Sequence, residues 1–197
     1  RWGSRGLGDV YKRQDKTKMI KYLRNNIGNP AHFGFIPIGL TTDSIEGFKY
    51  NMEKSKRLLK EYKQESGSNE IQLELSTDAN YLDIMEYIQR ELLELDIELK
   101  INIMPPSSLR QAKSNGKLEM FRASWIADYP DSENYLSLFY SKNKAPNGPN
   151  YTHFINKEYD MLYLNSFKEK SKFKREKIYK QLDKMIIDEA PIIPLYY

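Results

Sequence analysis

Two stretches of alternating apolar and polar residues flank one helical stretch in the middle of the chain. Ile71, Leu73 and Leu75 alternate with polar residues, and the same period of two returns in residues 96–104, as in half-buried strands. Between them, residues 81–95 place apolar side chains three and four positions apart, as an amphipathic helix does. A strand, a helix and a second strand with short joints predict a βαβ unit with parallel strands and a right-handed crossover.

The same helical spacing predicts helices on both sides of this unit. Their expected spans are 15–25, 51–64, 157–170 and 172–190. Asn51, Asn156 and Ser171 each precede one of these spans, where a short polar side chain can accept a hydrogen bond from a free backbone N–H group. Residues 28–42 hold too many Pro and Gly residues for a regular element, so they are expected to form an ordered loop.

Further elements are predicted after the βαβ unit. Ser107 or Ser108 is expected to cap a short helix that follows two prolines. Asp131 or Ser132 is expected to cap the next helix, whose Tyr, Leu and Phe side chains would pack inward. Residues 191–197 resemble the start of a strand, and their apolar end predicts that the native chain continues beyond the printed sequence.

The segment between these two helices predicts a third strand and the first candidate for a site. Residues 117–125 have the composition of a strand, which is expected to end between Trp125 and Tyr129, where a loop begins. In open α/β sheets, ligands gather at the carboxyl ends of the strands. The loop after this strand is therefore where we expect a ligand to bind.

Arg122, Trp125 and Asp128 lie within seven residues of one another at this strand end. The planar guanidinium of Arg matches a carboxylate, Asp can receive an ammonium group, and Trp can cover an apolar stem between the two. Together they could bind both charged ends of a zwitterion. The alternative is structural, with Arg122 and Asp128 as an ion pair and Trp125 in the core, and spacing alone favours this alternative.

The net charge of +4 does not indicate a nucleic-acid partner once its location is considered. Residues 1–14 contribute +3, from four basic residues against one acidic, so the other 183 residues carry only +1. Their Lys and Arg are interleaved with Asp and Glu, as on solvated helix faces. The 15 Tyr, 8 Phe and 2 Trp instead supply the large apolar faces of a folded core.

No pattern in the sequence supports catalysis. The two histidines, His32 and His153, stand in no metal-ligand spacing, and there is no cysteine. No phosphate-binding glycine motif, nucleophile elbow or zinc-protease motif occurs. Carboxylates such as Asp128 and Asp131 before a turn are more often caps than acids or bases. We therefore expect no enzyme activity, no cofactor and no bound metal.

The first fourteen residues differ in character from the rest of the chain. They contain three glycines and no amphipathic period, and residues 9–14 are one translation of a transposon end used in preparing sequencing libraries. We interpret residues 1–14 as a non-native, adaptor-derived segment and residues 15–197 as native. The lack of a signal peptide then carries no information, because the native start would lie upstream.

Several motifs in order resemble the extracellular solute-binding protein family 5, which contains the oligopeptide- and dipeptide-binding proteins of ABC importers. They are "YNMEKSKRLLKEY", "FRASWIADYPDSENYLSLFYS", "GPNYTHFINKEYDMLY" and "DEAPIIPLYY". The resemblance covers residues 15–197 and implies a partial second lobe of a two-lobed protein. The implied fold is an α/β, periplasmic-binding-protein-like (type II) lobe with a βαβ unit and C-terminal helices, incomplete at both ends. Asn51 and Met52 replace the Asp and Pro usual in the family, which alters a helix start and not the ligand site.

The resemblance also implies roles for four residues. Asp128 aligns with the acidic residue that holds the α-amino group of a bound peptide, and Tyr129 follows it in the same motif. Trp125 aligns with an aromatic residue that lines the cleft, and Arg122 with a basic residue that in some members meets the ligand carboxylate. Other members of the family bind nickel chelates, haem or sugars, so a non-peptide solute is the alternative ligand, and an enzyme on a similar lobe is a more distant one.

The implied protein is a monomer that captures small peptides and delivers them to the permease subunits of an ABC transporter. It would work in the periplasm or on the outer face of the bacterial cytoplasmic membrane. Its contact with the membrane would run through the permease or through a lipid anchor upstream of residue 15, as in a lipoprotein.

Overall fold

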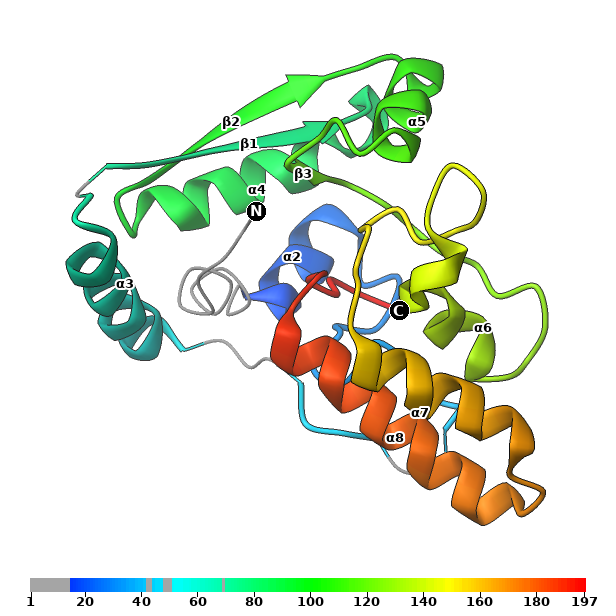
Figure 1. The fold of residues 1–197 in the computed structure, drawn as a ribbon. Helices are drawn as coiled ribbons and strands as arrows, with labels where there is room; N and C mark the ends of the chain where they lie inside the picture. Colours follow the sequence, from blue (N-terminus) through cyan, green and yellow to red (C-terminus); the bar gives the residue numbers. More distant parts are fainter. Residues whose placement is uncertain (1–14, 42–43, 48–50, 69) are drawn as a thin grey trace.

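The computed structural model describes residues 15–41, 44–47, 51–68 and 70–197. The segment predicted to be foreign, residues 1–14, lies outside the described residues. The elements are α2 (Lys16–Leu23), α3 (Met52–Ser66), β1 (Ile71–Thr77), the 3₁₀ turn η1 (Ala79–Tyr81), α4 (Leu82–Leu93), β2 (Ile97–Ile103), α5 (Pro106–Ser114), β3 (Met120–Phe121), α6 (Glu133–Leu136), the 3₁₀ turns η2 (Ser137–Phe139) and η3 (Ser141–Asn143), α7 (Lys157–Lys168) and α8 (Lys172–Glu189) (Figure 1).

A parallel sheet with the strand order β2-β1-β3 forms one part of the molecule. β1 and β2 pair in register from Ile71 opposite Ile97 to Thr77 opposite Ile103. The helix α4 connects them and covers one face of the sheet (Figure 1), because its apolar stripe buries side chains such as Ile84 against the strands. The predicted βαβ unit is confirmed.

The third strand is much shorter than predicted. Only Met120 and Phe121 pair with β1. Since β1 ends at Thr77, the chain makes one further ladder bond, from the Arg122 N–H group at 3.0 Å, and then has no strand to follow. The prediction of a strand over 117–125 was wrong, as was its expected end between Trp125 and Tyr129: those residues belong to an irregular loop.

Four helices begin after a polar side chain that caps them. Asp15, Asn51, Asn156 and Ser171 accept hydrogen bonds from backbone N–H groups at the starts of α2, α3, α7 and α8. The prediction that Ser107 or Ser108 caps α5 was wrong, because this helix begins at Pro106. A proline suits the first helical position, since its φ is preset and it has no N–H group to leave unpaired.

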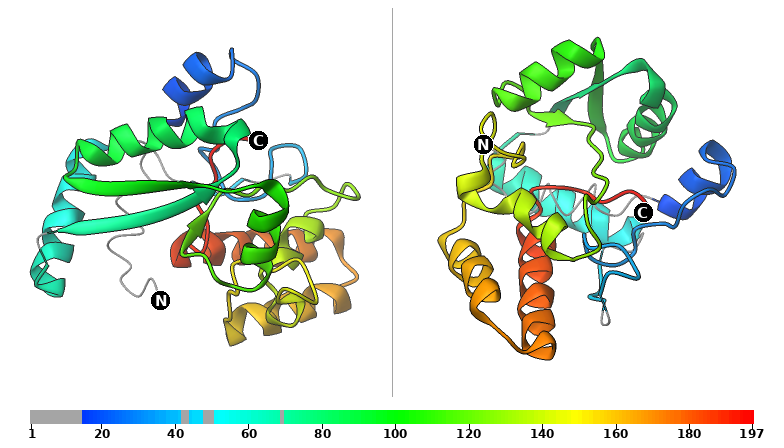
Figure 2. Two further views of the ribbon diagram at one scale, coloured as in Figure 1. Left: turned by 90° about the horizontal axis from the view of Figure 1, so that it is seen from above. Right: turned by 90° about the vertical axis from the view of Figure 1, so that its right-hand side faces the viewer.

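Two clusters of buried side chains stabilise the fold. One lies between the sheet and α2, α3 and α4, and includes Met19, Leu59 and Leu99. The other joins α6, α7 and α8 around the fully buried Tyr159 and Leu182. Figure 2 shows the sheet part and the helical part at opposite ends of the molecule. Within the described residues, no helix is long and apolar enough to cross a membrane.

The last residues of the chain run back between these two clusters (red in Figure 1). Ile192 packs against the helical cluster, whereas Ile193 and Leu195 pack against the sheet cluster. Tyr196 then forms an isolated antiparallel bridge with Pro30. The expected strand entry over 191–197 is present as this single bridge, and it connects the two cores.

Candidate functional site

The carboxyl ends of the three strands meet at one edge of the sheet, next to α5 (Figure 1). Asp78 follows β1, α5 follows β2, and Arg122 follows β3. Loops at this edge are not constrained by the ladder, so their side chains can point toward a ligand. The candidate site is built from these loops.

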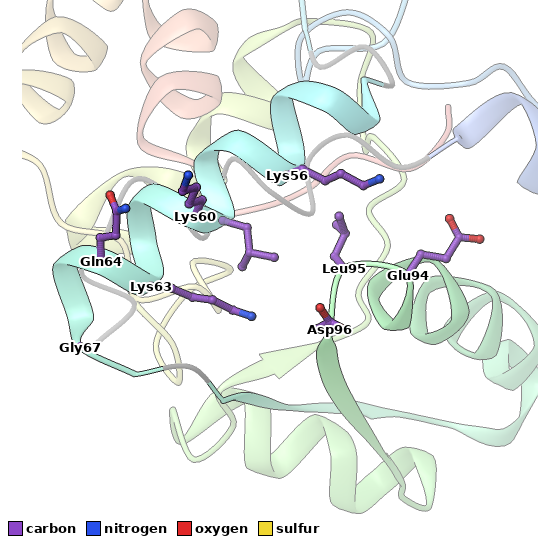
Figure 3. A pocket seen from close by; sticks show the side chains of 9 residues that line it. Lys56, Lys60, Lys63, Gln64, Gly67, Glu94, Leu95 and Asp96 are labelled. Carbon is purple, nitrogen blue, oxygen red and sulfur yellow. The ribbon is translucent and has the colours of Figure 1, made fainter.

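A groove of about 560 Å³ lies at the other edge, between α3 and the turn after α4 (Figure 3). Its walls carry Lys56 and Lys63 from α3 on one side and Glu94 on the other. Gly67 precedes β1 and Asp96 precedes β2, so the groove lies at the amino ends of the strands. This position separates the groove from the candidate site.

Arg122 packs its guanidinium over an aromatic ring instead of pairing with a carboxylate. Its Cζ atom lies 3.1 Å from the centre of the Tyr81 ring, a cation–π contact. The carboxylate of Asp128 is exposed and makes no hydrogen bond or ion pair with any residue that the structure describes. The structural alternative, an Arg122–Asp128 ion pair, is therefore wrong.

Lys113 belongs to the same edge, although the sequence analysis did not single it out. Its Nζ atom lies 5.7 Å from the centre of the Phe121 ring and 5.6 Å from that of Tyr151. Burial lowers the pKa of this lysine, and the positive charges of Arg122 and Arg110 lower it further. Three cations therefore share one edge of the sheet, where an anionic ligand group would relieve their mutual repulsion.

Tyr151 reaches Lys113 because its loop packs against the turn after α5. Gly116 in that turn has a φ of +63°, and a Cβ atom there would lie 2.6 Å from Cε1 of His153. His153 is therefore a packing residue here, while Nε2 of His32 lies 3.2 Å from the hydroxyl of Thr17. In the described ranges, no group of three or more His, Cys, Asp or Glu could hold a metal ion.

Asn134 joins two of the predicted site residues. Its side chain is 3% exposed, and its Oδ1 atom accepts a hydrogen bond from Nε1 of Trp125 at 2.7 Å. The same oxygen lies 3.4 Å from the backbone nitrogen of Asp128, a weaker bond. Trp125 is half-buried, so it is not part of the core, and one side of its ring remains accessible to solvent. The arrangement fixes the indole and turns the Asp128 carboxylate outward.

Tyr129 is held by a shared carboxylate. Its hydroxyl and that of Tyr163 donate to the two oxygens of Glu133. The bond to Glu133 is the main cause of the raised pKa of Tyr129, so the phenol stays protonated at neutral pH. Since 47% of Tyr129 is exposed, its ring adds an apolar surface beside Asp128.

The start of α6 positions this carboxylate. Asp131 accepts a hydrogen bond from the Glu133 N–H group at 2.8 Å and so caps the helix, as one of the two predicted alternatives. Ser132, the other alternative, instead donates its hydroxyl to the Leu40 carbonyl at 2.9 Å. The site loop is thereby anchored to residues far away in sequence.

We expect Asn134→Ala to destabilise the protein and to loosen this loop. The substitution leaves the Trp125 N–H group without its acceptor, which costs about 1–3 kcal/mol of unfolding free energy. Urea unfolding followed by circular dichroism measures this loss. Asn165→Ala, which removes an exposed asparagine from α7, is the matched control, and equal stabilities of the two variants would contradict the role given to Asn134.

An exposed carboxylate, two aromatic side chains and a cluster of cations thus lie on the segments that follow the strands of this α/β fold. Residues 14–147 match the family model described as bacterial extracellular solute-binding proteins, family 5 middle. The chain belongs to this family, as its motifs predicted.

The chain is also similar to individual proteins. It is 30% identical over 195 residues to the dipeptide-binding protein DppE of Bacillus subtilis, covering 93% of this chain and 35% of that protein. It is 30% identical over 198 residues to the oligopeptide-binding protein OppA of the same species, covering 93% of this chain and 35% of that protein. The chain thus spans about a third of the length of these relatives.

Solved structures confirm the predicted fold class. The periplasmic binding protein DppA from Helicobacter pylori, in complex with the peptide STSA, superimposes with a TM-score of 0.87 at 23% identity, over 98% of this chain and 38% of that one. AppA from Bacillus subtilis, in complex with a nonapeptide, gives a TM-score of 0.83 at 22% identity over 98% and 42%. The fold is that of the type II periplasmic binding proteins.

Proposed function

We propose that this chain is part of the substrate-binding component of an ABC importer, which captures peptides and delivers them to a membrane permease. The observation that carries the proposal is the exposed carboxylate of Asp128, which no described residue neutralises, held beside Trp125 by Asn134. The relatives named as dipeptide- and oligopeptide-binding proteins support this ligand class.

In the proposed complex, Asp128 receives the α-amino group of the peptide. A charge-assisted hydrogen bond is about twice as strong as a neutral one, and it requires a free ammonium group. Trp125 and Tyr129 cover the first residues of the peptide from the side. Arg122, with Lys113 beside the same strand end, offers positive charge to the ligand carboxylate. These are contacts of binding, and the proposed role includes no catalytic step.

Residues 15–197 form, on this proposal, part of the second lobe of a two-lobed protein. Peptide would be enclosed when another lobe closes over the strand edge, which excludes water and strengthens the charged contacts. The protein would act as a monomer in the periplasm or on the outer face of the cytoplasmic membrane, where the permease is its partner.

The test is to express the complete protein encoded by the source gene and to incubate it with a mixed pool of short peptides. Native mass spectrometry of the washed protein is expected to show retained peptides with free amino ends. Retention of a nickel chelate, haem or a sugar, with no peptide, would overturn the peptide proposal while leaving the binding role intact. Retention of none of these solutes would overturn both.

A further inference from the structure

The turn between α7 and α8 concentrates positive charge. Residues 168–177, which we call the α7–α8 tip, hold six basic residues and two acidic ones, a net charge of +4. This equals the net charge of the whole chain, and residues 1–14 add +3, so the remaining residues are on balance acidic at −3. The tip is therefore one of two concentrations of positive charge, the other being residues 54–60 of α3, which include four basic residues and no acidic one.

The basic side chains of the α7–α8 tip face solvent, while its acidic ones are partly withdrawn. All five lysines are exposed, whereas Glu169 and Glu176 are half-buried. Glu169 accepts a local hydrogen bond from the Ser171 N–H group at 2.8 Å. Glu176 lies 4.0 Å from Lys172, too far for a strong ion pair. With six basic residues against two acidic ones, the tip keeps a net charge of +4.

Two large aromatic rings are exposed among these lysines. Phe167 is 61% exposed and Phe173 is 66% exposed, and the Nζ atom of Lys177 lies 4.4 Å from the centre of the Phe173 ring. Along α7 the apolar surface continues through Met161 and Leu164, which lie on the same side of the helix at intervals of three residues. Solvated helix faces rarely carry such an apolar stripe, so charge alone does not explain this surface.

The α7–α8 tip lies at the end of the molecule away from the sheet (Figures 1 and 2). The strand ends lie away from the tip, whereas Tyr129 is connected to it through Glu133 and Tyr163, whose ring centre lies 5.2 Å from that of Phe167. Docking through the tip does not depend on which solute the strand-end site takes.

We propose that the α7–α8 tip docks on the surface of a membrane that contains anionic lipids. Such a surface offers phosphate groups to the lysines and a headgroup boundary into which Phe167 and Phe173 can insert. Five of the six basic residues are lysines, which act as mobile point charges, whereas a folded protein partner is typically matched by the fixed fork of arginine. Anionic lipid headgroups move freely in the membrane plane, so flexible lysines can pair with them without a fixed geometry.

The test measures sedimentation of the complete protein encoded by the source gene with vesicles of phosphatidylcholine that contain roughly 30% phosphatidylglycerol. Binding is expected at about 50 mM salt and is expected to be lost at about 500 mM, where charges are screened beyond a few ångströms. Vesicles of phosphatidylcholine alone should bind little. Equal binding to both kinds of vesicle, or no binding to either, overturns the proposal.

Matched variants locate the contact. Replacing Lys170, Lys172 and Lys174 by Glu is expected to lower the partition coefficient by roughly 100-fold or more, the contribution of three basic residues near an anionic surface. The control replaces three exposed lysines of α3, Lys54, Lys56 and Lys60, by Glu and changes the net charge equally. An equal loss in both triple variants would show that binding follows total charge and not the tip.

A second pair of variants tests insertion of the rings. Phe173→Ala is expected to weaken vesicle binding roughly tenfold, because an aromatic ring is withdrawn from the headgroup boundary. Ile155→Ala, which removes a side chain that is also 66% exposed, should leave binding unchanged. Unaltered binding of Phe173→Ala would limit the contact to charge and overturn the inserted geometry.

Discussion

Asp128→Asn is expected to weaken the binding of peptides with a free amino end by about 100-fold in the complete protein, since removal of one partner of a desolvated charge pair costs about 2–5 kcal/mol. Asparagine keeps the size and the backbone bond to Asn134, so the loop should retain its shape. What disappears is the negative charge that the ammonium group requires. Isothermal titration of one retained peptide measures the change.

The comparison with an N-acetylated form of the same peptide isolates the charge. The unsubstituted protein should prefer the free amine strongly, and Asp128→Asn should bind both forms about equally weakly. Asp96→Asn provides the control, because Asp96 is exposed at the amino edge of the sheet and its φ of +55° suits Asn as well. If Asp128→Asn kept the preference for the free amine, another group would have to bind it.

Acidification is expected to remove an unfavourable contribution of about 3 kcal/mol from a buried carboxyl, Asp183 in α8. Burial raises the pKa of Asp183 from 3.8 to about 6, although one of its oxygens accepts a hydrogen bond from the Phe35 N–H group at 2.7 Å. The folded state therefore holds a proton at Asp183 between pH 4 and 6 that the unfolded chain has released. The contribution of Asp183 to the free energy of unfolding therefore becomes more favourable as the pH falls from 6 to 4, and it is least favourable above pH 6.

Other carboxyl groups titrate in the same range, so the quantity to measure is the difference in unfolding free energy between the unsubstituted chain and a variant that lacks only this carboxyl. Urea unfolding at several pH values is compared between the unsubstituted chain and Asp183→Asn, which keeps an acceptor for Phe35. The two curves should approach each other as the pH falls from 7 to 4. Asp188→Asn, which alters an exposed carboxylate paired with Lys184 at 2.8 Å, should leave the slope unchanged. Parallel curves for Asp183→Asn would show that this carboxyl is not the buried group inferred here.

The parts of the fold that could be predicted from sequence are those that local patterns determine. The period of two over Ile71 to Leu75 lies within a single strand, and the helical period over residues 81–95 lies within a single helix. The parallel pairing of β1 and β2 follows from the order strand, helix, strand along the chain. The length of β3 could not be predicted in this way. Its carboxyl end lies where β1 also ends, and residues 117–119 do not pair although β1 extends past them, so neither limit is recorded in residues 117–125.

In the candidate site, too, the residues that stand close in sequence were predicted, and those brought together by packing were missed. Trp125 and Asp128 stand close in sequence and were singled out by their chemistry. Their common partner Asn134 was missed, because a buried asparagine in a predicted helix has no distinguishing pattern. Lys113 was missed as well, because its place follows from the packing of the last turn of α5 against Phe121 and Tyr151, which no local pattern records.

The segment that connects the two cores also constrains when the molecule can finish folding. The hydroxyl of Tyr197 donates to the carbonyl of Gly34, 163 positions earlier in the chain, and Ala31 is paired with Leu195 by a 3.1 Å backbone bond. During synthesis the bond between Gly34 and Tyr197 can form only after the 163 residues that follow Gly34 have been made. Until then Asn29 and Ala31 lack their backbone partners in this segment, so the contact between the two cores closes late in folding.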